Sequence, residues 1–379
     1  MRRRAIVIAG SIAQKPREAG HTWAFLQYLL GFVQLGWDVL LLDRLEPEMR
    51  RDAGASEGLA YLQTVLQQFN LEKNFSVICD GGRRFVGLDR QTVLDRVKNA
   101  DLLLNFNGFL PEGEIRAASR RRVYIDIDPG FAQMWKELGL HDAFSGHDDF
   151  VTIGLNIGDS DCHIPTCGLN WITTVQPIAL KYWPAHPSLP DGPITTIGAW
   201  RGPNGPVDFR GKRYGLRVHE FRRFADIPLR TGKMFSVALD IDPSETADID
   251  LLKRGGWTLI DPREAAADPD AYQKFIADSA AEFMMAKNMY VQSRSGWISD
   301  RSICYLASGR PVAAQDTGIE KHVPPGKGML LFSNPDEAVE RIKELTADYA
   351  AHACGARRLA EEYFSADRVL PELLSKLNL

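Results

Sequence analysis

Short apolar runs alternate with longer segments of helical periodicity along most of the chain. The run Ala5–Ala9 is continuously apolar and ends at Gly10, which is typical of a buried strand. Residues 21–36 then carry apolar side chains at helical spacing, and Gly36 ends the predicted helix. A second buried strand, WDVLLLD, follows at 37–43. This strand–helix–strand unit predicts a parallel sheet that helices cover on both faces.

The same alternation predicts further elements in both halves of the chain. Apolar runs predict strands at 75–80, 100–108, 122–130, 149–156, 193–200, 234–241, 257–261, 311–314 and 328–333. Helical periodicity predicts helices at 215–227, from Asp270 to about Lys287, from Ser299 to Gly309 and at 334–364. Residues 162–193 are rich in proline and lack periodicity, which is typical of a loop or linker.

The length of 379 residues exceeds what one core usually serves, so two domains are expected. The fold class is α/β, and the strand–helix rhythm restarts after the proline-rich stretch. We predict one Rossmann-like domain at residues 1–185 and a second at 186–360. The loop after the first strand lacks G-x-G-x-x-G, which argues against a tightly held NAD or FAD.

Composition narrows the class of protein. Charged residues make up 25% of the chain and hydrophobic residues 45%, which is the ordinary globular range. The formal net charge of -4 argues against nucleic acid as the main partner. No stretch approaches the ~20 apolar residues of a membrane span. The five cysteines complete no metal site, and we expect reduced thiols in a cytoplasmic protein.

The stretch SDRSICYLASGRPVAAQDTG, residues 299–318, concentrates polar groups at the start of a helix. A serine suits the N-cap, and an aspartate suits the positive end of the helix dipole. The free amides of the first turn, behind the loop SRSGW, would form an anion site. Alternatively, the serine only caps the helix and the charged side chains are solvated. The candidate residues are Ser295, Gly296, Ser299, Asp300, Arg301 and Ser302.

This stretch resembles the donor site of GT-B glycosyltransferases, whose retaining members carry EGFGL…EAMAxGxPVVA. KGMLLFSNPDEAVERI is similar to the NGLLV…DxxxLAxAI segment that follows in that family. AGHTWAFLQYLLGFVQLGWDV resembles the start of the acceptor domain. The resemblance covers most of the chain. It implies two Rossmann-like domains that face each other across a cleft, with the acceptor on the first and the nucleotide-sugar on the second. It also implies that a C-terminal helix, residues 361–379, crosses back to the first domain.

One position departs from the family pattern. The second glutamate of the family, which holds the ribose hydroxyls, falls at Cys304. A thiol cannot accept two ribose O–H bonds as a carboxylate does. Asp300 is the nearby acid, one helical turn earlier. Either Asp300 takes over this part, or this chain binds its donor differently.

Further donor-binding candidates follow from the resemblance. Arg201 and Arg217 correspond to the cations that neutralise the diphosphate, and Arg301 is a third candidate. Cations are required because charge builds up on the leaving group as the sugar departs. Ile260 and Asp261 end the strand beside the expected base pocket. The alternatives are solvated arginines and an aspartate that only caps a turn.

Polar residues of the first domain are candidates for catalysis and acceptor binding. His21 corresponds to the general base of similar inverting enzymes, and its ordinary pKa suits that task. It could equally cap a helix or line the cleft. Asn105 and Asn107 follow one strand and are expected to bind acceptor hydroxyls. Asp126 and Asp128 follow another, where we expect cleft polarity rather than a metal site.

We therefore expect a metal-independent glycosyltransferase without a cofactor. Its partners would be a nucleoside diphosphate sugar and a small-molecule or glycan acceptor. The alternatives are a nucleotide-sugar epimerase on the same fold and a non-catalytic binding protein. The loss of the family glutamate at Cys304 favours the latter.

Overall fold

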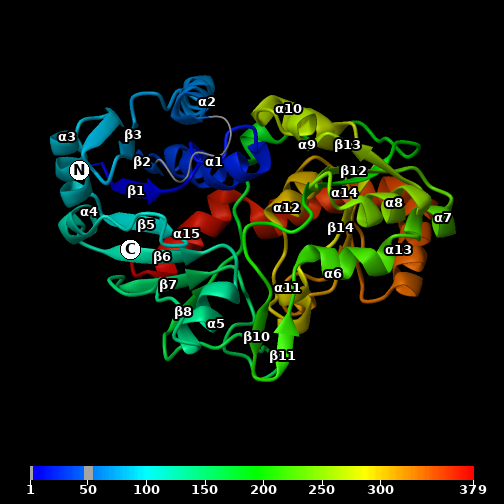
Figure 1. The fold of residues 1–379 in the computed structure, drawn as a ribbon. Coiled ribbons are helices and arrows are strands. Elements are labelled where there is room, and N and C mark those ends of the chain that lie inside the picture. The colour runs from blue at the N-terminus through cyan, green and yellow to red at the C-terminus, as the bar shows by residue number, and fades with distance from the viewer. Residues whose placement is uncertain (1–2, 47–53) are drawn as a thin grey trace.

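Two sheets form the centres of two lobes in the computed structural model, which describes residues 3–46 and 54–379 (Figure 1). The first sheet has the order β4-β3-β2-β1-β5-β6-β7-β8, and its strands pair in parallel apart from β3 with β4. These strands are β1 (Ala5–Ala9), β2 (Asp38–Leu45), β3 (Phe75–Cys79), β4 (Arg84–Gly87), β5 (Leu102–Phe106), β6 (Arg122–Asp126), β7 (Asp149–Thr152) and β8 (Trp171–Thr173). The helices of this first lobe are α1 (Ala19–Gln34), α2 (Gly54–Gln68), α3 (Arg90–Asn99), α4 (Gly113–Ala118) and α5 (Phe131–Glu137).

The second lobe is built on parallel strands in the order β13-β12-β9-β14-β15-β16. These are β9 (Ile194–Ala199), β12 (Phe235–Asp240), β13 (Trp257–Ile260), β14 (Ala281–Met284), β15 (Val312–Gln315) and β16 (Met329–Phe332). Its helices are α6 (Arg217–Phe221), α7 (Ile227–Thr231), α8 (Thr246–Arg254), α9 (Pro262–Ala265), α10 (Pro269–Ala277), α11 (Asn288–Ser293), α12 (Asp300–Ala307), α13 (Pro335–Ala347) and α14 (Tyr349–Leu359). A short hairpin of β10 (Val207–Phe209) and β11 (Lys212–Tyr214) precedes α6.

The strand orders explain where a site can form. In the first sheet the order reverses between β1 and β5, and in the second it reverses between β9 and β14. Ligands of doubly wound sheets bind outside the carboxyl ends of the strands at such a reversal. The loops after β1, β9 and β14 are therefore the natural places to look for chemistry.

The helix predicted from Asp270 to about Lys287 is present only in its first half. The helix α10 ends at Ala277, and the buried strand β14 lies in the middle of the second sheet. Its residues Ala, Glu, Phe and Met have ordinary or good helix propensity, and tertiary burial overrides that preference. Glu282 is fully buried in this strand, and an ion pair with Arg301 of α12 compensates its charge.

Smaller differences separate the predicted elements from the observed ones. The predicted helix 334–364 is divided into α13 and α14 at Asp348 and ends in a π-helical turn, Ala360–Phe364. The predicted helix 215–227 is divided into short pieces. The proline-rich stretch contains β8, which extends the first sheet.

The C-terminal helix α15 (Ala366–Lys376) lies in the first lobe, beside α1 (Figure 1). Gly31 of α1 makes this approach possible, since a Cβ there would lie 2.5 Å from Leu370 Cδ1. Both ends of the chain lie in the first lobe. The domain limits at residues 185 and 360 stay predictions. Over the described parts of the chain, no helix combines the length and apolar character that crossing a membrane requires.

Replacing Leu370 by alanine should lower the free energy of unfolding by about 2–5 kcal/mol, because the side chain is fully buried against α1. Glu372, on the exposed side of α15, provides the matched control, and its replacement should change stability by no more than about 0.5 kcal/mol. Urea denaturation followed by circular dichroism measures both. Equal effects would show that α15 does not pack as described.

Candidate active site between the lobes

Cationic side chains from both lobes gather where the carboxyl ends of the two sheets meet. Arg217 is the first residue of α6, and Lys287 follows the end of β14. Burial lowers the pKa of Arg217 to about 10, and the charge of Arg301 acts in the same direction. Burial also lowers the pKa of Lys287, and the charges of Arg217 and Lys15 add to this effect. The charge of Asp128 opposes these effects on Lys287, and a bound anion would likewise favour the charged forms of both side chains.

Arg217 is the least satisfied member of this cluster. Its Nη1 donates to the carbonyl of Ala199 at 3.1 Å. Its Nε is buried and finds no acceptor within the described part of the chain. Gly198 leaves room for the guanidinium, because a Cβ there would lie 2.1 Å from Nη1. A buried guanidinium nitrogen without an acceptor is costly, and a phosphate oxygen would satisfy it.

Arg301 and Arg201, the other two expected phosphate ligands, are each paired with a carboxylate of this chain. Arg301 is 7% exposed, pairs with Glu282 and donates to the carbonyl of Ile197 at 2.8 Å. Although it is buried, its positive charge adds to the effect of burial in lowering the pKa of Arg217. Arg201 is exposed and pairs with Glu245 at the start of α8. The sequence placed it correctly after β9, and in the structure its guanidinium is bound by this carboxylate.

The start of α12 differs from the expected open anion site. Ser299 occupies the N-cap position, but its hydroxyl accepts no helix amide and lies 3.4 Å from Asp300 Oδ1. Ser302 is fully buried, and its hydroxyl has no partner among the described residues. Ser295 Oγ donates to the carbonyl of Tyr290 at 3.3 Å. All three serines are therefore buried within the second lobe rather than exposed at its surface.

Gly296 belongs to a joint between the lobes, because a Cβ on it would lie 2.8 Å from Asn156 of the first lobe. The Asn156 side chain donates to the carbonyls of Arg294 at 2.9 Å and Gly318 at 3.0 Å. His322 Nε2 lies 2.8 Å from Asn156 Oδ1. The sequence analysis missed Asn156, and no spacing or motif marks an asparagine as the centre of a contact between distant segments.

Ile260 and Asp261 lie at the end of β13, the edge strand of the second sheet. Asp261 accepts the amide of Arg263 at 2.8 Å and caps α9, as the alternative interpretation held. Because β12 separates β13 from β9, these residues do not join the cationic cluster.

His21 of α1 lies in the first lobe, beside the loop that follows β1. Its Nε2 lies 2.8 Å from the Oγ of Ser11 and 3.2 Å from the Ser11 carbonyl. Burial lowers its pKa well below 6.5, and the charge of Lys15 adds to this effect. Asp43 holds the loop by accepting the amide of Ala13 at 2.6 Å. His21 is therefore neutral at pH 7, the form in which an imidazole accepts a proton.

Asp300 lies half-buried at the start of α12, and burial raises its pKa. Burial raises the pKa of Tyr28 on α1, and the charge of Asp300 acts in the same direction. Cys304, one turn later, is buried with its Sγ 4.0 Å from Gln27 Nε2 of α1. The position of the family glutamate is thus covered by the first lobe and packs as a small apolar residue.

Three of the expected acceptor-binding residues form hydrogen bonds within the first lobe. Asn105 is fully buried and accepts the amide of Leu110 at 2.9 Å. Asn107 accepts the amide of Ile127 at 3.0 Å. Asp126 is buried, with Gln133 Nε2 at 2.6 Å and Thr152 Oγ1 at 2.8 Å. The alternation along the strands did place these residues in one region of the first lobe. Their polar groups, however, are hydrogen-bonded to loops and neighbouring elements of that lobe.

Asp128 is placed differently, because it reaches the second lobe. Lys287 Nζ lies 2.8 Å from its Oδ1 and 2.6 Å from its Oδ2. Tyr290 also donates to this carboxylate, and Asn204 Nδ2 lies 3.3 Å from it. The sequence analysis missed Lys287, since it placed that residue at the end of a long helix.

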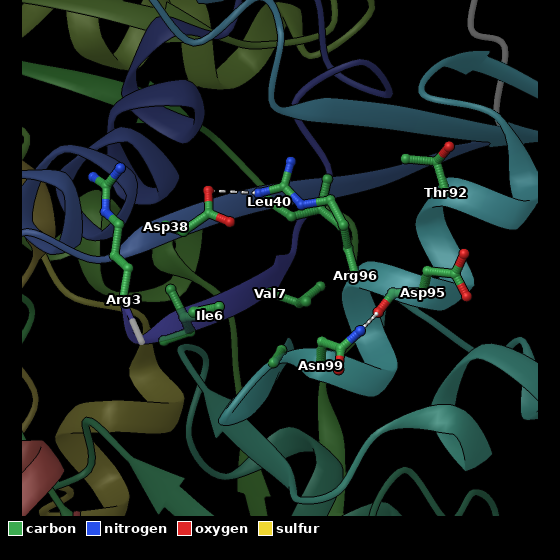
Figure 2. Close-up of a pocket in the computed structure, with 11 residues that line it drawn as sticks. Arg3, Ile6, Val7, Asp38, Leu40, Thr92, Asp95, Arg96 and Asn99 are labelled. Atoms are coloured by element: carbon green, nitrogen blue, oxygen red, sulfur yellow. Dashed lines mark hydrogen bonds and ion pairs between the residues drawn. The ribbon is translucent and has the colours of Figure 1, made fainter. Parts of the chain in front are cut away.

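Two further observations bear on ligands. Across residues 3–46 and 54–379, no three or more His, Cys, Asp or Glu side chains are grouped as a metal site needs. A cavity of about 320 Å³ opens at the opposite, amino-terminal edge of the first sheet. Figure 2 shows that Arg96 pairs there with Asp38, and that Asn99 turns to Asp95. This cavity lies away from the cationic cluster.

Neither a protein-family model nor a curated protein matches the sequence. Solved structures match nearly the whole chain. An alpha-glucosyltransferase in complex with UDP-glucose and DNA is 13% identical, with 100% of this chain and 99% of that one covered and a TM-score of 0.60. AviGT4, a glycosyltransferase involved in avilamycin A biosynthesis, is 11% identical, with 99% and 97% covered and a TM-score of 0.57. Sucrose-phosphate synthase from Thermosynechococcus elongatus is 12% identical, with 99% of each chain covered and a TM-score of 0.54.

These likenesses confirm the predicted fold, two Rossmann-like domains that face each other as in GT-B glycosyltransferases. They correct the exclusion of nucleic acid. The alpha-glucosyltransferase structures contain DNA, so a chain of this fold can act beside a polyanion. Net charge is an average over the whole surface and does not describe one cleft.

Replacing Lys15 by methionine should raise the pKa of His21, because the nearby positive charge is lost. The value should stay below 6.5, since burial is the larger cause. An NMR titration of the His21 ring proton measures this shift. Lys136→Met is the control, because Lys136 pairs with Asp142. An unchanged pKa of His21 in the Lys15 variant would show that the charge of Lys15 does not act on His21.

Proposed function

We propose that this protein transfers a sugar from a nucleoside diphosphate sugar to an acceptor hydroxyl. The observation that carries the proposal is the buried Nε of Arg217, which lies within a cluster of cations and has no acceptor among the described residues. A diphosphate supplies acceptor oxygens and negative charge to such a cluster. UDP and UDP-glucose are the ligands named for the alpha-glucosyltransferase structures, which supports this donor class.

In the proposed reaction the acceptor oxygen attacks the anomeric carbon, and the bond from that carbon to the diphosphate breaks. Arg217 and Lys287 stabilise the charge that develops on the leaving diphosphate. These side chains supply the positive charge that a metal ion supplies in other enzymes, so we propose a metal-independent reaction. The second lobe would hold the donor and the first lobe the acceptor.

His21 is the proposed general base. Its neutral imidazole can take the proton of the acceptor hydroxyl as the new bond forms. Ser11 orients the ring from one side through Nε2. This role belongs to a reaction that inverts the anomeric configuration. The acceptor is proposed as a small molecule or glycan.

The proposed place of action is the cytoplasm, because no disulfide joins the cysteines within the described parts of the chain. A nucleotide-sugar epimerase and a non-catalytic binding protein are the competing functions. Release of free nucleoside diphosphate only when an acceptor is present would exclude both. The acceptor panel should include simple sugars, glycans and a DNA duplex.

The decisive experiment is binding of UDP, TDP, GDP, ADP and CDP by thermal shift, with and without EDTA. A nucleotide at 100 times its Kd should add about 2.7 kcal/mol of stability. Arg217→Ala should weaken binding of the best nucleotide by about 1.5–3 kcal/mol, the scale of a charged hydrogen bond.

Arg201→Ala is the matched control, since Arg201 also follows β9 but pairs with Glu245. Its affinity should stay within about twofold of the unchanged protein, the scatter expected for an exposed ion pair. Equal affinities of the Arg217 variant and the unchanged protein would refute the assigned diphosphate site.

A further inference from the structure

Asp128 brings a negative charge from the first lobe into the cationic cluster of the second. It lies in the turn after β6, two residues beyond Asp126. Its carboxylate binds side chains of the second lobe, namely Asn204, Lys287 and Tyr290. Its carboxylate is therefore a bridge between the lobes rather than part of the first lobe's own framework.

The surroundings of Lys287 leave little space for another anion. Both oxygens of Asp128 lie within 2.8 Å of its Nζ. The ring of Phe131 lies 5.1 Å from Nζ, and the ring of Tyr290 lies 5.4 Å away. The lysine side chain is only 16% exposed. A phosphate oxygen that approaches this ammonium must therefore take a place that the carboxylate now holds.

We propose that Asp128 is an internal substitute for the donor's phosphate, and that the diphosphate displaces it from Lys287. This inference rests on the proposed function and adds a regulatory contact to it. The carboxylate neutralises a buried cation while the site is unliganded. When the donor arrives, Lys287 exchanges a carboxylate of the first lobe for a phosphate.

The exchange has a consequence for the lobes. Lys287, Tyr290 and Asn204 lose their shared partner at the same moment, so one contact between the lobes is released. The joint at Asn156 does not involve these residues and remains. Donor binding would thus loosen the lobes on the Asp128 side while the Asn156 side acts as a pivot.

The test compares Asp128→Asn with the unchanged protein by calorimetric titration of inorganic pyrophosphate and of UDP. Pyrophosphate reports on the diphosphate site whichever base the donor carries. Asparagine keeps the size of the side chain but removes the charge that competes for Lys287. Both probes should bind about 3- to 10-fold more tightly, the scale of a partly exposed ion pair.

Asp161→Asn is the matched control. Asp161 also links the lobes, through Lys321 at 2.6 Å and Arg294 at 3.4 Å, and the substitution changes the net charge equally. It does not contact Lys287, so its affinities should stay within about twofold of the unchanged protein, like those of other exposed pairs. Thermal unfolding of each variant verifies that it folds.

Weaker or unchanged binding in Asp128→Asn, while the unchanged protein binds in an Arg217-dependent way, would overturn the inference and leave the proposed function standing. Weaker binding would make Asp128 a residue that positions Lys287. Absence of binding in every form would overturn the proposed function together with the inference. Binding by Asp128→Asn alone would support the displacement most strongly.

Discussion

The buried ion pair between Glu282 and Arg301 is the constraint on which the second lobe depends. Glu282 lies in the middle of the central strand β14 and is fully buried. Removing one partner of such a pair costs about 3–5 kcal/mol, because the other charge is left buried without compensation. The pair therefore holds α12 against β14.

The cluster around Arg217 and Lys287 shows how a fold can build a site that favours an anion before any anion is bound. Burial lowers the pKa values of both side chains, and neighbouring cations add to this effect. The buried Nε of Arg217 adds a donor without an acceptor. Arg217 and Lys287 follow the strands β9 and β14, between which the strand order reverses. The same topology that creates the site therefore also places its positive charge. The carboxylate of Asp128 relieves part of this charge from across the cleft.

The local sequence pattern was sufficient to find site residues that lie where a strand or helix begins or ends. Arg217 was found because a cation at the first turn after a strand has a place in the family pattern. Lys287 was missed because its neighbours Ala281–Met284 have the composition of a helix. The hydrogen bonds of Asn105, Asn107 and Asp126 within the first lobe could not be foreseen, since a polar residue at a strand end serves a loop as readily as a ligand.

The sequence by itself determined the α/β class, the two-lobed plan and the stretch 299–318 as a helix followed by a buried strand. Apolar periodicity records which faces are buried, and glycine and proline record where elements end. The tertiary structure alone decided which polar groups remain available. Arg201 and Arg301 carry the same charge as Arg217, but carboxylates from distant segments neutralise them. Such pairings depend on long-range packing, which no local pattern encodes.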